Sequence, residues 1–142
     1  MKKAIMITLM MLVAMSTIAQ ERASSASLNE RFYQAKLREL VYRLHITDAQ
    51  KKKFEPIYRN YCEEMTTLWA ERKTPIPPNV SSKAAAIEKR KMEMQQRAQG
   101  IRMKYIDKFA TVLSEQQVEQ FYDVESQIQK KLKQRRDQAR NQ

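Results

Sequence analysis

The chain has 142 residues, with 27 basic and 16 acidic side chains that give a formal net charge of +11, and it contains one His, one Cys and one Gly. A single cysteine excludes an intramolecular disulfide, and the sequence holds no glycine-rich phosphate loop, nucleophile elbow or paired-cysteine motif. These features argue against an enzyme. A strongly basic chain inside a cell would point to nucleic acid, whereas an exported one meets acidic polypeptides and anionic lipid head groups.

Residues 1–19 have the pattern of a secretory signal peptide. Lys2 and Lys3 precede an apolar run over residues 4–13, and small residues lie near a cleavage site after Ala19. The run is too short to cross a bilayer and no later stretch reaches about 20 apolar residues, so we expect no stable membrane insertion. Cleavage would remove two lysines and leave a net charge of +9. We therefore expect a periplasmic protein with no nucleic-acid partner.

The next two segments are a disordered N-terminus and a short helix. Residues 20–28 are small and polar, and they offer nothing to bury. From residue 29 to residue 44, Tyr33, Leu37, Leu40 and Leu44 recur at steps of three and four. This spacing predicts a helix with one apolar face.

A second helix is predicted over residues 48–72, where aromatic and apolar side chains form one stripe. Pro56 lies inside it and removes one backbone hydrogen bond, which predicts a bend rather than an end because the stripe keeps its phase. Cys62 falls beside the stripe. It can be a small buried residue of this helix or form a bridge to a second chain.

Two further helices complete the predicted all-α fold. Pro75, Pro77 and Pro78 mark a turn over residues 73–82, and Ser81 or Ser82 can cap a third helix that reaches residue 112. A fourth helix is predicted over residues 115–136, followed by a disordered basic tail at 137–142. Short links favour a four-helix antiparallel, hairpin-like layout with two long helices. Narrow apolar stripes on long helices leave a thin core, which predicts a homodimer.

One pattern occurs twice, as Ile46-Thr47-Asp48-Ala49-Gln50 and as Leu113-Ser114-Glu115-Gln116-Gln117. In each copy a hydroxyl residue precedes a glutamine by three positions, which is the spacing of a capping box at a helix start. Asp48 and Glu115 then occupy the first helical position, where a negative charge suits the helix dipole. The pattern predicts two matched helix starts.

The two copies, carried by Ile46, Thr47 and Gln50 and by Leu113, Ser114 and Gln117, resemble the motif of the periplasmic LTXXQ-motif family. The resemblance covers residues 33–136 of the helical domain that is predicted at 29–136. It implies a four-helix hairpin that dimerises through its long helices into a thin, curved cradle. It also implies the function of a Spy-type chaperone, which binds unfolded or misfolded proteins under envelope stress without ATP, or of a CpxP-like adaptor, which binds and inhibits an envelope-stress sensor kinase through its periplasmic domain.

For the chaperone reading, Met and basic side chains supply adaptable apolar contacts and long-range attraction. The candidate client-binding residues are Arg59, Arg72, Lys89, Arg90, Met94, Arg97 and Arg102. A zinc- or copper-stress role remains an alternative, since relatives include zinc binders and thioethers bind Cu(I). His45 and Cys62 lie about four helical turns apart and do not form a tetrahedral site within one chain, so no metal or cofactor is expected.

Overall fold

The computed structural model describes residues 29–141, so the predicted signal peptide at 1–19 and the segment 20–28 lie outside the described residues. The chain divides into two compact units, residues 1–38 and 39–142, which are described separately. In the first, residues 29–38 are helical, and this helix ends at residue 43. Tyr33 and Leu37 are buried, as the spacing predicts.

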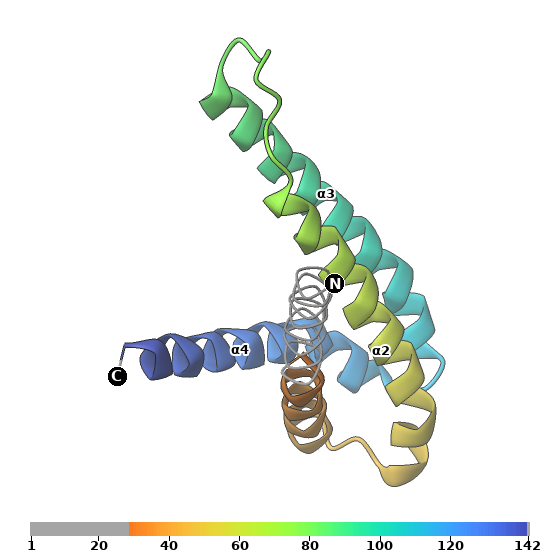
Figure 1. Ribbon diagram of the computed structural model, residues 1–142. Coiled ribbons are helices and arrows are strands. Elements are labelled where there is room, and N and C mark those ends of the chain that lie inside the picture. The colour runs from red at the N-terminus through yellow and green to blue at the C-terminus, as the bar shows by residue number, and fades with distance from the viewer. Residues whose placement is uncertain (1–28, 142) are drawn as a thin grey trace, which may run out of the picture. The chain divides into compact units, whose positions relative to one another are not determined.

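The second unit contains three long helices, labelled in Figure 1. They are α2 (Asp48–Ala70), α3 (Lys83–Ala110) and α4 (Glu115–Arg140), and a short 3-10 turn, η1 (Glu71–Lys73), follows α2. No strand occurs between residues 29 and 141, which confirms the all-α prediction for the described chain. None of the described helices combines the length and apolar character needed to cross a membrane.

Both predicted capping boxes are present. The hydroxyl of Thr47 accepts from the backbone N–H of Gln50 at 3.2 Å, and the Gln50 side chain accepts from the Thr47 N–H at 3.0 Å. Ser114 and Gln117 form the same reciprocal pair at 3.3 and 2.8 Å. Each box satisfies backbone donors that would otherwise be unpaired at a helix start, so the boundaries at 48 and 115 follow directly from the sequence.

The link before α2 is closed by a Schellman motif centred on His45. Its φ of 52° lies in the left-handed region, where glycine is usual. The N–H of Ile46 donates to the carbonyl of Val41 at 3.0 Å, and that of His45 donates to Tyr42 at 3.3 Å. The His45 Nδ1–H also donates to the Tyr42 carbonyl at 2.9 Å. His45 is therefore a helix-ending residue.

Helices α2 and α3 form the antiparallel hairpin that the proline turn predicted, and they lie side by side in Figure 1. Two ion pairs show the antiparallel register. Glu71, in the 3-10 turn after α2, pairs with Arg97, and Glu64, earlier on α2, pairs with Lys104, later on α3. Leu68, Met94 and Ala98 form a buried cluster between the two helices. The turn itself is held by Arg90, which donates to the carbonyls of Thr74 and Pro75.

An aromatic cluster lies where α2, α3 and α4 meet. Most of its ring pairs pack edge to face or tilted, at centroid separations of 4.4 to 6.3 Å, and Phe54 and Tyr58 are stacked at 5.4 Å. The fully buried members are Phe54, Tyr58, Tyr61, Tyr105, Phe109 and Phe121. Large rings at a helix crossing bury much apolar area from few positions, so this cluster joins α4 to the hairpin.

The helix ends differ by a few residues from their predicted positions, and α3 ends at Ala110 instead of residue 112. α2 becomes a 3-10 turn after Ala70, close to the predicted end at residue 72. α4 continues to Arg140, so residues 137–140 of the predicted disordered tail are helical, while residue 142 lies outside the described chain. Lys, Gln, Arg and Ala are all good helix formers, which accounts for the longer helix without any packing at this end. α2 runs through Pro56 without interruption.

Candidate functional site

The two motif glutamines contact each other. Gln50 Nε2 donates to Gln117 Oε1 at 2.9 Å, and Gln117 Nε2 donates to Gln50 Oε1 at 3.3 Å. Gln117 Nε2 also donates to the carbonyl of Leu44 at 3.0 Å. Each glutamine thus caps its own helix and at the same time ties the two helix starts together. This geometry makes the repeated pattern a structural junction, with its polar groups already paired inside the chain.

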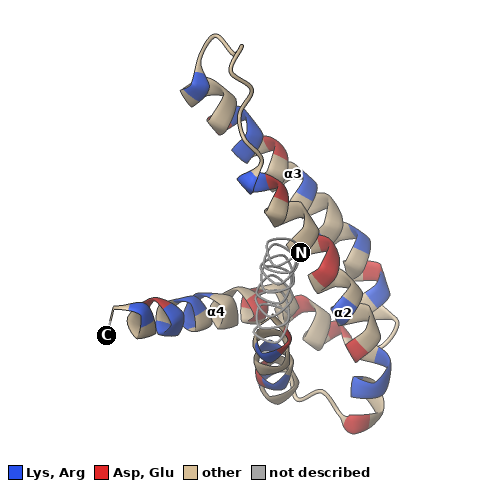
Figure 2. Cartoon of the chain, in the orientation of Figure 1, with Lys and Arg blue, Asp and Glu red and all other residues tan. Residues whose placement is uncertain are grey.

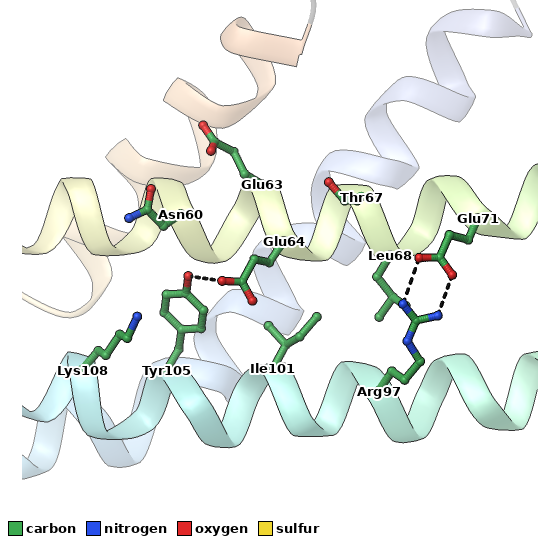
Figure 3. Close-up of a pocket in the computed structure, with 10 residues that line it drawn as sticks. All are labelled: Asn60, Glu63, Glu64, Thr67, Leu68, Glu71, Arg97, Ile101, Tyr105 and Lys108. Atoms are coloured by element: carbon green, nitrogen blue, oxygen red, sulfur yellow. Dashed lines mark hydrogen bonds and ion pairs between the residues drawn. The ribbon is translucent and has the colours of Figure 1, made fainter.

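A cleft of about 520 Å³ runs between α2 and α3 (Figure 3). Across it, Arg97 makes a bidentate pair with Glu71 at 2.5 and 2.9 Å. One turn or two further along, Glu64 accepts from Lys104 at 2.7 Å and from the Tyr105 hydroxyl at 2.8 Å. The charged groups of the cleft therefore cross-link the hairpin.

The protonation equilibria in this cleft follow from those pairs. The hydrogen bond from Lys104, with that from Tyr105, lowers the pKa of Glu64, and the Arg97 guanidinium lowers the pKa of Glu71. Burial, together with the Glu64 carboxylate, raises the pKa of Tyr105 to about 12. Both carboxylates are ionised at neutral pH and neither is held in the protonated form that a general acid requires.

A second, open groove of about 470 Å³ lies between α3 and α4. Met103 and Ile106 line its α3 side, and Tyr122 lines its α4 side together with polar residues. Gln99, Arg102, Asp123, Glu125, Ser126 and Gln129 are the remaining lining residues. Apolar and polar groups therefore alternate along this groove, whereas the α2–α3 cleft is crossed by ion pairs.

The base of the groove holds a buried carboxylate. Glu125 is 6% exposed and accepts from the Tyr61 hydroxyl at 3.0 Å. Burial and the Glu125 charge raise the pKa of Tyr61, while the Arg102 side chain acts in the opposite direction. The Tyr122 hydroxyl donates to the Arg102 carbonyl at 2.6 Å. Glu125 was not identified as a buried residue from the sequence.

The candidate client-binding residues are spread along the hairpin and into the α3–α4 groove. Lys89 is exposed, and Arg59 is half-buried. Arg90 holds the proline turn and Arg97 is paired with Glu71. Arg72 lies over the Trp69 ring at 6.0 Å. Arg102 alone lines the α3–α4 groove.

Met94 requires a correction. It is 3% exposed and lies in the hairpin core with Leu68 and Ala98, and Met65 packs against that cluster. Met94 lies on the apolar face of α3, and its side chain packs toward α2. It therefore cannot contact a client at the surface of the hairpin. Core filling is its role.

The available thioethers lie on the opposite side of α3. Met92 and Met103 are 67% and 70% exposed, and Ile106 is 38% exposed. Together with the exposed Gln96 and Gln99 they recur at steps of four and three, which places them on one face. We call these five residues the α3 stripe. The same spacing is visible in the sequence, so this face could have been identified there.

The described residues contain no group of three or more His, Cys, Asp or Glu side chains able to hold a metal ion. Cys62 is half-buried and forms no disulfide within the described residues. Its bridge to a second chain stays a prediction.

Comparisons with known protein families, with curated proteins and with solved structures returned no match. The resemblance to the LTXXQ-motif family therefore rests on the two capping boxes and the residues around them.

Proposed function

We propose that the chain is an ATP-independent periplasmic chaperone that binds unfolded or misfolded polypeptides. The observation that carries the proposal is the α3 stripe beside the α3–α4 groove. Met103 and Ile106 expose 70% and 38% of their surface in a place where no described segment covers them. Grouped exposed apolar side chains are typical of interaction surfaces, and flexible thioethers can adapt to clients of many shapes.

Charge supports the same proposal. Without the predicted signal peptide the chain has a net charge of +9, and Arg102 contributes a cation to the groove itself. Long-range attraction raises the encounter rate with acidic chains, and short-range apolar contact slows their release. A client would thus be captured by charge and retained by the α3 stripe.

The test is light scattering from a chemically denatured client diluted into buffer with the purified protein and without nucleotide. The expected result is suppression of aggregation near stoichiometric ratios. The double variant Met92→Gln, Met103→Gln should require several times more protein for the same suppression. Tyr42→Ser is the matched control, because Tyr42 is 78% exposed and lies outside α3.

Two outcomes would overturn the proposal. A folded protein that fails to suppress aggregation even in excess is no chaperone for that client class, and a single stoichiometric partner in an envelope pull-down would then favour the kinase-adaptor alternative. Equal activity of the double variant and the Tyr42→Ser control would remove the α3 stripe as the contact surface. The mass of the purified protein in solution tests the expected homodimer in the same preparation.

A further inference from the structure

The last three turns of α4 carry a dense group of cations. We call residues 129–140 the α4 basic segment. They contain six basic side chains and one acidic one, a net charge of +5 out of the +11 of the whole chain. All of its residues are exposed except the half-buried Leu132 and Asp137. Figure 2 shows blue side-chain positions repeated along this end of α4. We propose that the α4 basic segment binds acidic stretches of unfolded polypeptide, an inference that rests on the chaperone function proposed above.

Most of these cations form no ion pair with the part of the chain that the structure describes. Lys131 pairs with Glu39 at 3.4 Å, and Arg136 pairs with the adjacent Asp137 at 3.6 Å. Lys130, Lys133, Arg135 and Arg140 form no ion pair with any residue between 29 and 141. On α2 and α3, by contrast, Arg97 and Lys104 are paired with carboxylates across the hairpin. The unpaired cations keep their full attraction for an external anion.

The distribution of the cations around the helix favours a flexible partner. At 3.6 residues per turn the six basic positions point to all sides of α4 instead of gathering on one face. Their positions are Lys130, Lys131, Lys133, Arg135, Arg136 and Arg140. A flat lipid surface can meet only about half of such a helix, and Leu132 alone offers no apolar face to enter a head-group layer. An unfolded chain can follow the helix surface and reach cations on several sides.

Composition separates a polypeptide from a nucleic acid as the partner. Residues 129–140 contain no aromatic side chain. Single-stranded nucleic acids are usually held by base stacking on aromatic rings in addition to charge, and this segment offers charge alone. Carboxylates suit it better, because Arg can hold a carboxylate with two parallel hydrogen bonds and Lys with one.

The segment also continues the proposed client surface. Gln129 lines the α3–α4 groove and is the first residue of the α4 basic segment. A client whose apolar stretch contacts Met103 and Ile106 would therefore place a neighbouring acidic stretch within reach of the cations. This continuity assigns a preference among clients: apolar segments followed by Asp or Glu should bind faster than those followed by neutral residues.

The experiment compares two disordered peptides that share one apolar segment, one flanked by Asp and Glu and the other by Ser and Gly. Stopped-flow anisotropy gives their association rates with the full protein and with the variant K130Q/K133Q/R135Q/R140Q, in which Gln preserves helix propensity. The matched control K52Q/K53Q/K73Q/K83Q removes the same charge from exposed lysines outside α4. We expect the α4 variant to lose about tenfold in association rate with the acidic peptide only, and the control to lose less than about twofold.

The outcomes separate this inference from the chaperone proposal. If the protein suppresses aggregation but both variants bind the acidic peptide equally fast, the inference fails and the chaperone function stands. If the protein neither suppresses aggregation nor binds either peptide, both fail. Tighter binding to phosphatidylglycerol vesicles or to single-stranded DNA than to the acidic peptide, lost in the α4 variant, would also overturn the inference and identify the other anion class as the partner.

Discussion

Replacement of Gln117 by Ala tests whether the two capping boxes act as one junction. The change removes the acceptor for the Ser114 N–H at 2.8 Å, the acceptor for Gln50 Nε2 at 2.9 Å and the donor to the Leu44 carbonyl at 3.0 Å. A neutral hydrogen bond contributes about 1 kcal/mol net, and these groups are half-buried, so the free energy of unfolding should fall by about 2–3 kcal/mol. In a domain of this size that corresponds to a melting temperature lower by about 10 °C.

Gln50→Ala provides the second arm. It removes the acceptor for the Thr47 N–H at 3.0 Å and its part of the pair with Gln117, so it should cost about 1–2 kcal/mol. Because both single changes remove the same Gln50–Gln117 bonds, the double variant should cost about 1 kcal/mol less than the sum of the single costs. Urea unfolding followed by circular dichroism measures all three values.

Gln116→Ala is the matched control, because Gln116 is exposed in the same turn of α4 and lies outside the junction. It should change the free energy of unfolding by less than about 0.5 kcal/mol. The reasoning is refuted if Gln117→Ala costs no more than Gln116→Ala. Strict additivity of the Gln50 and Gln117 effects would show that the boxes act separately and that the contact between them contributes nothing.

Four further changes can be measured by the same unfolding assay. Gly100→Ala should raise the free energy of unfolding by about 1 kcal/mol, because a Cβ at this helical position meets nothing within 4 Å; a loss would mean that α3 is covered there. His45→Val should cost more than about 1 kcal/mol, since a β-branched residue is strained at a φ of 52°, and His45→Asn should cost less. Tyr61→Phe should cost about 1.5–3 kcal/mol by removing a hydrogen bond to the buried Glu125 carboxylate; a neutral effect would show that other groups satisfy it. Burial raises the pKa of Tyr105 to about 12. The contribution of its neutral hydroxyl to the free energy of unfolding is therefore complete below pH 10 and is lost as the pH rises from 10 toward 12. Absorbance at 295 nm follows the ionisation, and unfolding measured at the same pH values would detect the loss.

The helix starts could be predicted from the sequence because their causes are local. A capping box needs only residues three positions apart, and both boxes are formed as the sequence predicted. Ser82 likewise caps α3 through the Ala85 N–H at 3.2 Å. The positions of these helix starts follow from backbone donors that must be satisfied, whatever the rest of the fold does.

The errors occurred where the outcome depended on distant contacts. Met94 and Met103 look alike in sequence, but one is 3% and the other 70% exposed, because only the register of α3 against α2 decides which face is covered. Glu125 is buried and accepts a hydrogen bond from Tyr61, 64 residues earlier, which offsets the cost of its burial. The pairing of Gln50 with Gln117 is a tertiary contact between two locally predictable motifs. The spacing of apolar residues identifies the apolar face of a helix but not the element that covers it.

The two sides of α3 therefore have different chemistry, and this difference separates stability from binding. On the α2 side, Arg97 and Lys104 are committed to Glu71 and Glu64 and should contribute little to client capture. On the α4 side, Met103 and Ile106 remain exposed beside a groove. If binding takes place there, variants of the capping boxes should lower the melting temperature while leaving client association rates unchanged at temperatures where the protein stays folded. A parallel loss of both properties would instead make the junction part of the binding surface.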